Sequence, residues 1–511
     1  MNWTEGYLTE GYIFGYFREL SPDNLRLACL SAGLAPPTAK PLRYLELGYG
    51  QGIPINIHAA AAPGEYWGTD FNPTQTAFAH SLADAAGSDV VLLNDSFSEL
   101  AARSDLPKFD IIALHGIWTW VSEENHRIIV DIIKRNLQAG GVVYISYNCL
   151  PGWAPAAPLR HLVKLYGELA SSDIASVEDK LIAGAKFTQQ VVDAGAHYFR
   201  DHPNVVEVLN SLIATDPHYL SHEYFTKAWY LMTFSDMART LGNAKLTFAT
   251  SATIFEHVDS INFSSQGQGL LAKIGNPILR QSVRDYLVNQ QFRRDIFING
   301  PRQLAPSERW EMLRAELFVL ASNPDDIPMR IISPTGEIKL KEQIYRPLIE
   351  VLAEENYAPK TLGQLAGHGK LRSLEISEIF EALLVLTGSS HVCVAREPTV
   401  ESRRHCSALN RYICEQARSE GQVNHIASPV TGSGLYVNRT EQLLLLAGQL
   451  GKESPAEKAA YLTELVIAQG HGFTRDQKAL MTPEEIRTAL TRDATMFAQK
   501  RLPIFKALGI V

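Results

Sequence analysis

Cysteine is scarce in this chain of 511 residues, which contains only Cys29, Cys149, Cys393, Cys406 and Cys414. Their number is odd and no two of them form a C-x-x-C pair, which argues against a disulfide framework and against a zinc ribbon. A protein without disulfides is typical of a reducing compartment, so we expect a cytoplasmic location.

Other familiar signals are absent too. No run of about 18 apolar residues occurs, so no membrane span is predicted. The first residues, 1–6, lack the basic start and apolar stretch of a signal peptide. His218 and His222 are spaced like two metal ligands on one helix face, but no third ligand follows nearby, and we predict no metal site. The G-x-S-x-G elbow of serine hydrolases is also missing.

Basic charge is not in excess. Lys and Arg number 47 and Asp and Glu number 55, which gives a formal net charge of -8. Non-specific nucleic-acid binding needs a basic surface, so we expect no nucleic-acid partner. The apolar content of 46% is that of an ordinary globular protein. At roughly 150 residues per domain, the length predicts about three domains.

Five apolar segments at regular spacing indicate the strands of one sheet. Helical or turn-forming segments separate them, and this alternation predicts βαβ units, a mostly parallel sheet and an α/β fold. Right-handed crossovers place the carboxyl ends of the strands along one edge, where open α/β sheets bind their ligands. The segments are 42–47, 66–69, 90–93, 109–114 and 142–147.

The remaining chain is divided by changes in pattern. A strand candidate at 245–250 follows a long helical region, so we expect a core of residues 1–265 with a helical insertion at about 154–230 that lies over the ligand edge. Residues 266–300 form a further segment, in which Arg284, Asp285 and the run 293–295 predict a salt-bridged helix face. Residues 301–395 are read as a winged-helix-like module or a plain helical packing module, and 396–511 as a helical C-terminal domain.

The sequence YLELGYGQG at 44–52 predicts a buried strand that ends in a glycine turn. Gly48, Gly50 and Gly52 let a ligand approach the backbone closely, and the amides at the following helix start can face a carboxylate. A dinucleotide fingerprint would need glycine at position 53, which is Ile53. With Glu46 in front, the pattern favours a nucleoside without a pyrophosphate, such as S-adenosylmethionine.

Acidic residues follow the second and third strand segments. The Asp70 carboxylate can accept hydrogen bonds from a ribose diol, and Phe71 and Asn72 are placed beside it. Capping of the next helix is an alternative role for Asp70 and Asn72.

Asp95 follows the third segment and can accept the adenine amino group, with Ser96 and Phe97 in the same site. The alternative is that Asp95 is a simple loop acid.

The fourth strand segment ends in His115 and Gly116, which we place near the transferable methyl group. His115 can orient the substrate or act as a base, or it can be a structural histidine. Trp118 and Trp120 can line an acceptor channel, because an aromatic face attracts an ammonium group, or they can pack in the core.

Residues after the fifth segment complete the predicted site. Tyr147 and Asn148 can bond an acceptor amine and align its lone pair with the sulfonium, and alignment supplies much of the rate of an in-line displacement. Trp153 and the aromatic N-terminal residues Tyr12 and Tyr16 are further predicted substrate contacts.

These sequences resemble bacterial class I S-adenosylmethionine-dependent methyltransferases that carry a methyltransferase regulatory domain. The resemblance covers roughly residues 1–300. Besides the glycine loop, it rests on GTDFNP, HGIWTWV and YNCLPGW in the first part, and on YLSHEY, RDY and FRRD in the second. They begin at residues 68, 115, 147, 219, 284 and 292.

The resemblance implies a Rossmann-like fold, S-adenosylmethionine as cofactor and S-adenosylhomocysteine as product. Some of these methyltransferases modify lysines of outer-membrane proteins and many of them pair, so a protein lysine acceptor and a homodimer are implied. A glycan or small metabolite as acceptor, or a non-catalytic cofactor-binding scaffold, are the alternative functions.

Overall fold

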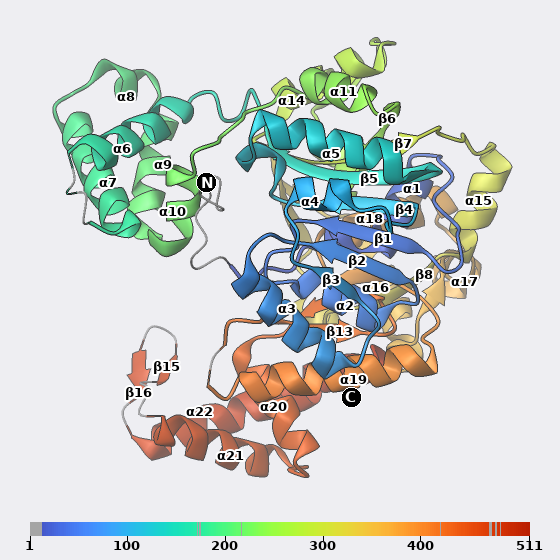
Figure 1. Cartoon of the computed structure of the whole chain (residues 1–511). Coiled ribbons are helices and arrows are strands. Elements are labelled where there is room, and N and C mark those ends of the chain that lie inside the picture. The colour runs from blue at the N-terminus through green and yellow to red at the C-terminus, as the bar shows by residue number, and fades with distance from the viewer. Residues whose placement is uncertain are drawn as a thin grey trace.

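The computed structural model describes residues 13–170, 172, 175–215, 217–419, 421–469, 473–475, 478–480 and 482–511. A seven-stranded sheet with the order β3-β2-β1-β4-β5-β7-β6 forms its centre (Figure 1). Strand β7 runs antiparallel to β5 and β6, and the other pairs are parallel. The strands are β1 (Arg43–Leu47), β2 (Glu65–Thr69), β3 (Val91–Leu93), β4 (Phe109–Leu114), β5 (Leu137–Asn148), β6 (Leu246–Ser251) and β7 (Phe292–Asn299).

The five predicted strand segments and the delayed sixth strand correspond to β1 to β6, which confirms the mostly parallel α/β sheet. The prediction that residues 293–295 lie on a salt-bridged helix face is wrong, because these residues lie in a strand. Arg293 and Asp295 lie in β7, and they are buried together with Asp285 of α14. Since β7 lies between β5 and β6, the expected boundary at residue 265 would cut through the sheet.

Helices cover both faces of this sheet. On one face, α4 (Phe97–Ala102), α5 (Glu123–Asn136) and α11 (Phe234–Gly242) pack with apolar residues of β1, β4 and β5. On the other face lie α1 (Pro22–Ser31), α2 (Ile53–Ala61) and α3 (Pro73–Ala86). Short helices α12 (Asp259–Asn262), α13 (Ser265–Ala272) and α14 (Pro277–Val288) connect β6 to β7.

The predicted insertion is a helical lobe with an apolar cluster of its own, which includes Leu159, Leu181 and Leu209. Figure 1 shows this lobe beside the sheet, joined to it by two chain segments. Its helices are α6 (Ala157–Leu169), α7 (Val177–Asp193), α8 (His197–Asp201), α9 (Pro203–Ala214) and α10 (Pro217–Phe225).

The region 301–395 has the three helices and short strand that the sequence indicated, namely α16 (Glu342–Tyr357), α17 (Leu362–Gly367), α18 (Ile376–Gly388) and β12 (Val392–Ala395). Strand β12 pairs with β8 (Leu317–Leu320), which in turn pairs with β11 (Lys360–Thr361). The other elements are α15 (Pro306–Ala315) and the hairpin of β9 (Arg330–Ser333) and β10 (Gly336–Lys339).

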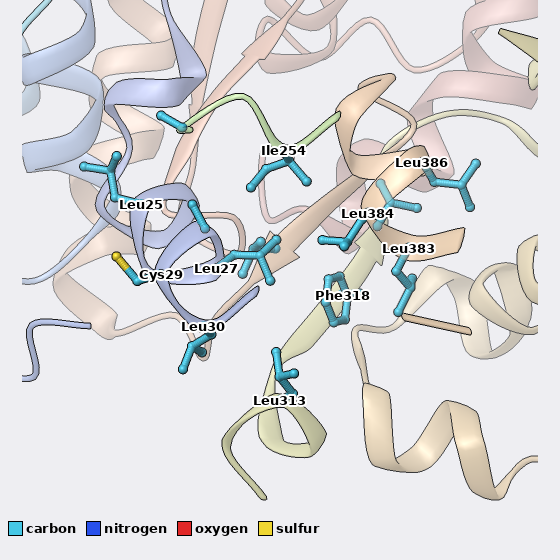
Figure 2. Packing of buried hydrophobic residues seen from close by; sticks show 14 of the residues in the cluster. Leu25, Leu27, Cys29, Leu30, Ile254, Leu313, Phe318, Leu383, Leu384 and Leu386 are labelled. Carbon is cyan, nitrogen blue, oxygen red and sulfur yellow. The ribbon is translucent and has the colours of Figure 1, made fainter. Parts of the chain in front are cut away.

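This region packs directly onto the sheet domain. Leu25, Leu27 and Leu30 of α1 belong to the same apolar cluster as Phe318 and Leu383, as Figure 2 shows. Burying leucine and phenylalanine side chains contributes about 1.5–3 kcal/mol each. The contact therefore joins the two regions into one body.

The C-terminal region covers α2 and α3. Cys406 of α19 (Val400–Gln416) is buried with its Sγ 3.5 Å from the carbonyl oxygen of Ala60. The region is mostly helical as expected, with two added hairpins. Its further elements are β13 (His425–Ser428), β14 (Ser433–Tyr436), α20 (Arg439–Gln449), α21 (Pro455–Ala468), β15 (Phe473–Arg475), β16 (Lys478–Leu480), α22 (Pro483–Met496) and α23 (Leu502–Ala507).

None of the helices within the described ranges combines the length and apolar character that a membrane crossing requires.

Candidate active site

A cavity of about 350 Å³ opens at the carboxyl ends of β1, β2 and β4. Three parts of the chain form its walls. The strand ends and the loops after them supply Glu46, Asp70 and His115, the segment before α1 supplies Phe17, and the segment after α10 supplies Tyr230. Because parallel strands end at one edge, residues far apart in sequence meet here, as the sequence predicted.

The glycine loop adopts the backbone that its composition permits. Gly48, Gly50 and Gly52 have φ angles of 73°, 58° and 70°, which other residues rarely adopt. A Cβ on Gly48 would lie 2.4 Å from Cδ1 of Ile117, a residue that also lines the cavity. Gly48 and Gly50 line the cavity. Gly52 precedes α2 and packs closely against Ala79, which makes it a helix-packing residue in this structure.

Asp70 connects the glycine loop to the end of β2. Its Oδ2 accepts a hydrogen bond from the Gly50 amide at 2.9 Å, and its Oδ1 accepts one from the Asn72 amide at 2.9 Å. Burial raises the pKa of Asp70 to about 6, against the lowering effect of these two bonds. Each carboxylate oxygen has two lone pairs, so both can accept a further hydrogen bond from a ligand.

Glu46 is buried at the end of β1 and lines the same cavity. The Tyr44 hydroxyl donates a hydrogen bond to its Oε2 at 3.2 Å. Burial, with a smaller contribution from the charge of Asp70, raises the pKa of Glu46 to about 8. Two carboxyl groups therefore lie at neighbouring strand ends, of which Asp70 is the one more readily ionised at neutral pH.

The residues after β2 and β3 divide into cavity walls and helix caps. Phe71, Asp95, Ser96 and Phe97 line the cavity as predicted. Asp95 also accepts a hydrogen bond from Arg103 at 3.0 Å, and the hydroxyl of Ser96 caps α4. Asn72 is not among the lining residues, and its side chain caps α3 through the Thr74 amide, which is the alternative that the sequence left open.

His115 forms part of the wall next to the N-terminal segment. Its ring stacks on Phe17 with 3.8 Å between ring centroids, and its Nδ1 is 2.7 Å from the Tyr144 hydroxyl. Burial and the nearby Arg294 guanidinium lower the pKa of His115 to about 3, so the imidazole is neutral at physiological pH. The Gly116 amide donates to the Ser146 hydroxyl at 2.8 Å and is not a lining group.

Tyr147 does not lie where the sequence placed it. Its ring is fully buried, and its hydroxyl donates to Oδ2 of Asp295 at 2.6 Å, away from the lining residues. The catalytic role predicted for Tyr147 is thus corrected to a structural bond between β5 and β7. Asn148 is buried and also outside the cavity lining, so its catalytic role stays a prediction.

Of the predicted aromatic substrate contacts, Trp120 lines the cavity. Trp118 is fully buried and stacks on His126, so the core-packing alternative is right for it. Trp153 packs edge-on against Trp229, outside the lining. Tyr16 is buried, with its hydroxyl 3.0 Å from His58 Nε2, and lines a different cavity. Tyr12 lies outside the described residues.

Two segments of the wall were not predicted from the sequence. Ile13, Gly15 and Phe17 precede the first helix, and the sequence around them shows only a high content of aromatic residues. Lys227 and Tyr230 follow α10 in the segment that returns from the helical lobe. In the part of the chain that the structure describes, no three His, Cys, Asp or Glu side chains are arranged to hold a metal ion.

The chain is similar to several known proteins. Residues 216–299, which include β6 and β7, match the family described as "Predicted methyltransferase regulatory domain". The chain is 37% identical over its full length to the Synechocystis protein "Uncharacterized protein sll1526", of which it covers 100%. It is 25% identical to "Uncharacterized protein RP789" of Rickettsia prowazekii over 53% of this chain and 49% of that protein.

Among solved structures, the chain is similar to PKMT2 from Rickettsia typhi in complex with AdoHcy. The TM-score is 0.71 at 18% identity, and the alignment covers 96% of this chain and 99% of PKMT2. The sheet order and this likeness identify the class I methyltransferase fold.

Proposed function

Because the chain belongs to the family of the Synechocystis protein sll1526 and has the class I methyltransferase fold, we propose that it is a methyltransferase that uses S-adenosylmethionine. The observation that carries the proposal is the bond between the Asp70 carboxylate and the Gly50 amide at 2.9 Å. It places the acid of β2 beside the glycine loop of β1, at the edge of a cavity. A nucleoside needs this combination of a hydroxyl acceptor and a close backbone approach.

The residues present fit this cofactor. Asp70 has lone pairs left for the ribose hydroxyls, and Asp95 and Phe97 offer an acceptor and a ring for adenine. The bare backbone of Gly48 and Gly50 allows a bulky ligand to lie against the loop. When bound, the sulfonium supplies an activated methyl group, and the chain's own residues position the acceptor and exclude water.

At the acceptor end, we expect alignment to matter more than a strong base. His115 is neutral, so it places no positive charge beside a sulfonium, and Phe17 and Tyr144 fix its ring. Trp120 and Tyr230 line the same cavity and offer aromatic faces to a cationic acceptor. Holding two reactants in line can contribute several kcal/mol to lowering a barrier.

A protein lysine amine is the acceptor that we propose. The carboxylates of Asp70 and Asp95 line the cavity together with the aromatic residues, while Glu46 keeps its proton at neutral pH. That lining attracts an ammonium group and is a poor match for an acidic metabolite. The resemblance of the sequence to protein-lysine methyltransferases supports the same choice.

The homodimer and the cytoplasmic location stay predictions, and all five cysteines are free thiols.

The test is transfer of a labelled methyl group from S-adenosylmethionine to a panel of acceptors, followed by amino-acid analysis. We expect methylated lysine from lysine-rich protein, and no label in glycans or small amines. Label found only in glycans or small metabolites would replace the acceptor and keep the activity. S-adenosylhomocysteine binding with no turnover on any acceptor would favour the scaffold alternative.

A further inference from the structure

The segment 226–232, which returns from the helical lobe, is fixed at both ends by hydrogen bonds. The Thr226 carbonyl oxygen accepts from Arg160 and Lys164, each at 3.3 Å. At the other end, the Tyr230 amide donates to the Thr119 carbonyl oxygen at 2.8 Å, and the Met232 amide donates to the Asn148 carbonyl oxygen at 3.2 Å. The backbone between these anchors is thereby held against the cavity.

Lys227 lies between the two anchors, and it lines the cavity together with Ala228 and Tyr230. The residue is exposed, so its ammonium group remains in contact with solvent. Within the described residues, the structure gives Lys227 no ion pair. Lysine carries its amine on a flexible four-carbon stem with three rotatable donors. The amine can therefore turn from solvent into the cavity without moving the backbone.

The surroundings of Lys227 are those that the proposed acceptor requires. The rings of Trp120 and Tyr230 line the same cavity as Lys227. They attract a lysine amine whether it comes from another protein or from this chain. An amine held at the cavity also has a high effective concentration, so even slow transfer to it competes with transfer to a free acceptor.

We propose that Lys227 is a methylation site of the protein itself, and this inference rests on the proposed function. The lone pair of the deprotonated Lys227 Nζ attacks the methyl carbon of the bound sulfonium cofactor, and an N–C bond forms. The S–C bond breaks and its electron pair stays on sulfur, which leaves neutral S-adenosylhomocysteine. The methylated ammonium keeps its charge or returns a proton to solvent before a second transfer.

The experiment incubates the purified full-length protein with S-adenosylmethionine and no other acceptor. Intact mass and fragment mass spectrometry then locate any added methyl group. We expect methylation on Lys227 at a rate per molecule that does not depend on protein concentration, because the acceptor belongs to the same chain. The variant Lys227→Arg should lose this modification, while the control Lys273→Arg, at an exposed residue outside the cavity, should keep it.

Thermal stabilisation by S-adenosylhomocysteine is measured in parallel to separate this inference from the proposed function. Stabilisation with no methyl group on Lys227 would overturn the inference and leave the function standing. The wild type could also carry no methyl group while S-adenosylhomocysteine stabilises Lys227→Gln less than it stabilises the wild type. That result would make Lys227 a cofactor contact and would overturn the inference that it is a methylation site. Methylation elsewhere that persists in Lys227→Arg would do the same. Absence of stabilisation in every variant would overturn both proposals.

Discussion

Replacing Asp70 by asparagine should weaken cofactor binding strongly and leave the fold intact. In the folded protein, the Asp70 carboxylate accepts from the amides of Gly50 and Asn72 at 2.9 Å each. Asparagine has one side-chain oxygen, so one of these amides loses its acceptor. A hydrogen bond to a charged group contributes about 1.5–3 kcal/mol to the free energy of unfolding.

An opposing effect comes from the charge itself. The pKa of Asp70 is raised from 3.8 to about 6 by burial, so its ionised form at neutral pH costs on the order of 3 kcal/mol, at about 1.4 kcal/mol per pH unit. Asparagine relieves this cost. The two effects offset each other to within about 1–2 kcal/mol, so Asp70→Asn should change the melting temperature by only a few degrees.

Cofactor affinity has no such compensation. Each hydrogen bond between a ribose hydroxyl and the Asp70 carboxylate contributes about 1.5–3 kcal/mol, so losing one weakens S-adenosylhomocysteine binding roughly 10- to 150-fold. Isothermal titration of wild type and Asp70→Asn measures this directly, with the exposed Asp84→Asn as the matched control. Binding by Asp70→Asn within threefold of wild type would refute the role of Asp70.

The remaining predictions concern pH, the glycine loop and Tyr147. S-adenosylhomocysteine affinity, measured by titration from pH 5 to 8, should fall as the pH falls through about 6, because Asp70 takes up a proton there; an affinity independent of pH would contradict this. The raised pKa values of Asp70 and Glu46 also mean that their contribution to the free energy of unfolding is present at acid pH and is lost as the pH rises through about 6 and about 8. Gly48→Ala should lower stability and affinity, since left-handed backbone costs about 1–2 kcal/mol and overpacking against Ile117 about 1–3 kcal/mol more. Gly87 has a φ of 61° and open space around it, so the control Gly87→Ala should show only the cost of the left-handed backbone when its free energy of unfolding is measured by chemical denaturation. Tyr147→Phe should lose about 1.5–3 kcal/mol of stability with the Asp295 bond and keep its rate of methyl transfer; a slower rate at unchanged stability would restore Tyr147 to catalysis.

The sequence predicted the parts of the site whose signals are local. Gly48, Gly50 and Asp70 stand at strand ends where a turn requires small residues and where parallel topology collects polar groups. Those requirements can be read within a few residues of each position. Right-handed crossovers then bring the carboxyl ends of the parallel strands to one edge, where the acidic residues lie beside the glycine loop.

The sequence could not predict β7, because its charged residues satisfy each other in the interior. Arg293 donates to Asp295 at 2.9 Å and also contacts Asp285 of α14, and both partners are buried. In the sequence, this run of charged residues is typical of a solvated helix face. Only the folded structure shows that the charged residues are paired with each other. Charged residues are rarely buried unless they are paired in this way.

Tyr147 was misplaced for a related reason. Residues 141–149 of β5 and the loop after it are almost all buried, because helices cover both faces of the sheet. Alternation of apolar and polar residues is then lost, and the sequence gives no sign of the face to which Tyr147 points. Phe17 was missed because its contact with His115 joins residues 17 and 115, and no local pattern encodes so distant a contact.

The most direct test of the account is a crystal structure of the protein with S-adenosylhomocysteine. We predict ligand density in the cavity at the ends of β1 and β2, with a ribose hydroxyl within about 3 Å of an Asp70 carboxylate oxygen. Density elsewhere, or a cavity that stays without ligand at saturating concentration, would contradict the assignment of this cavity as the cofactor site.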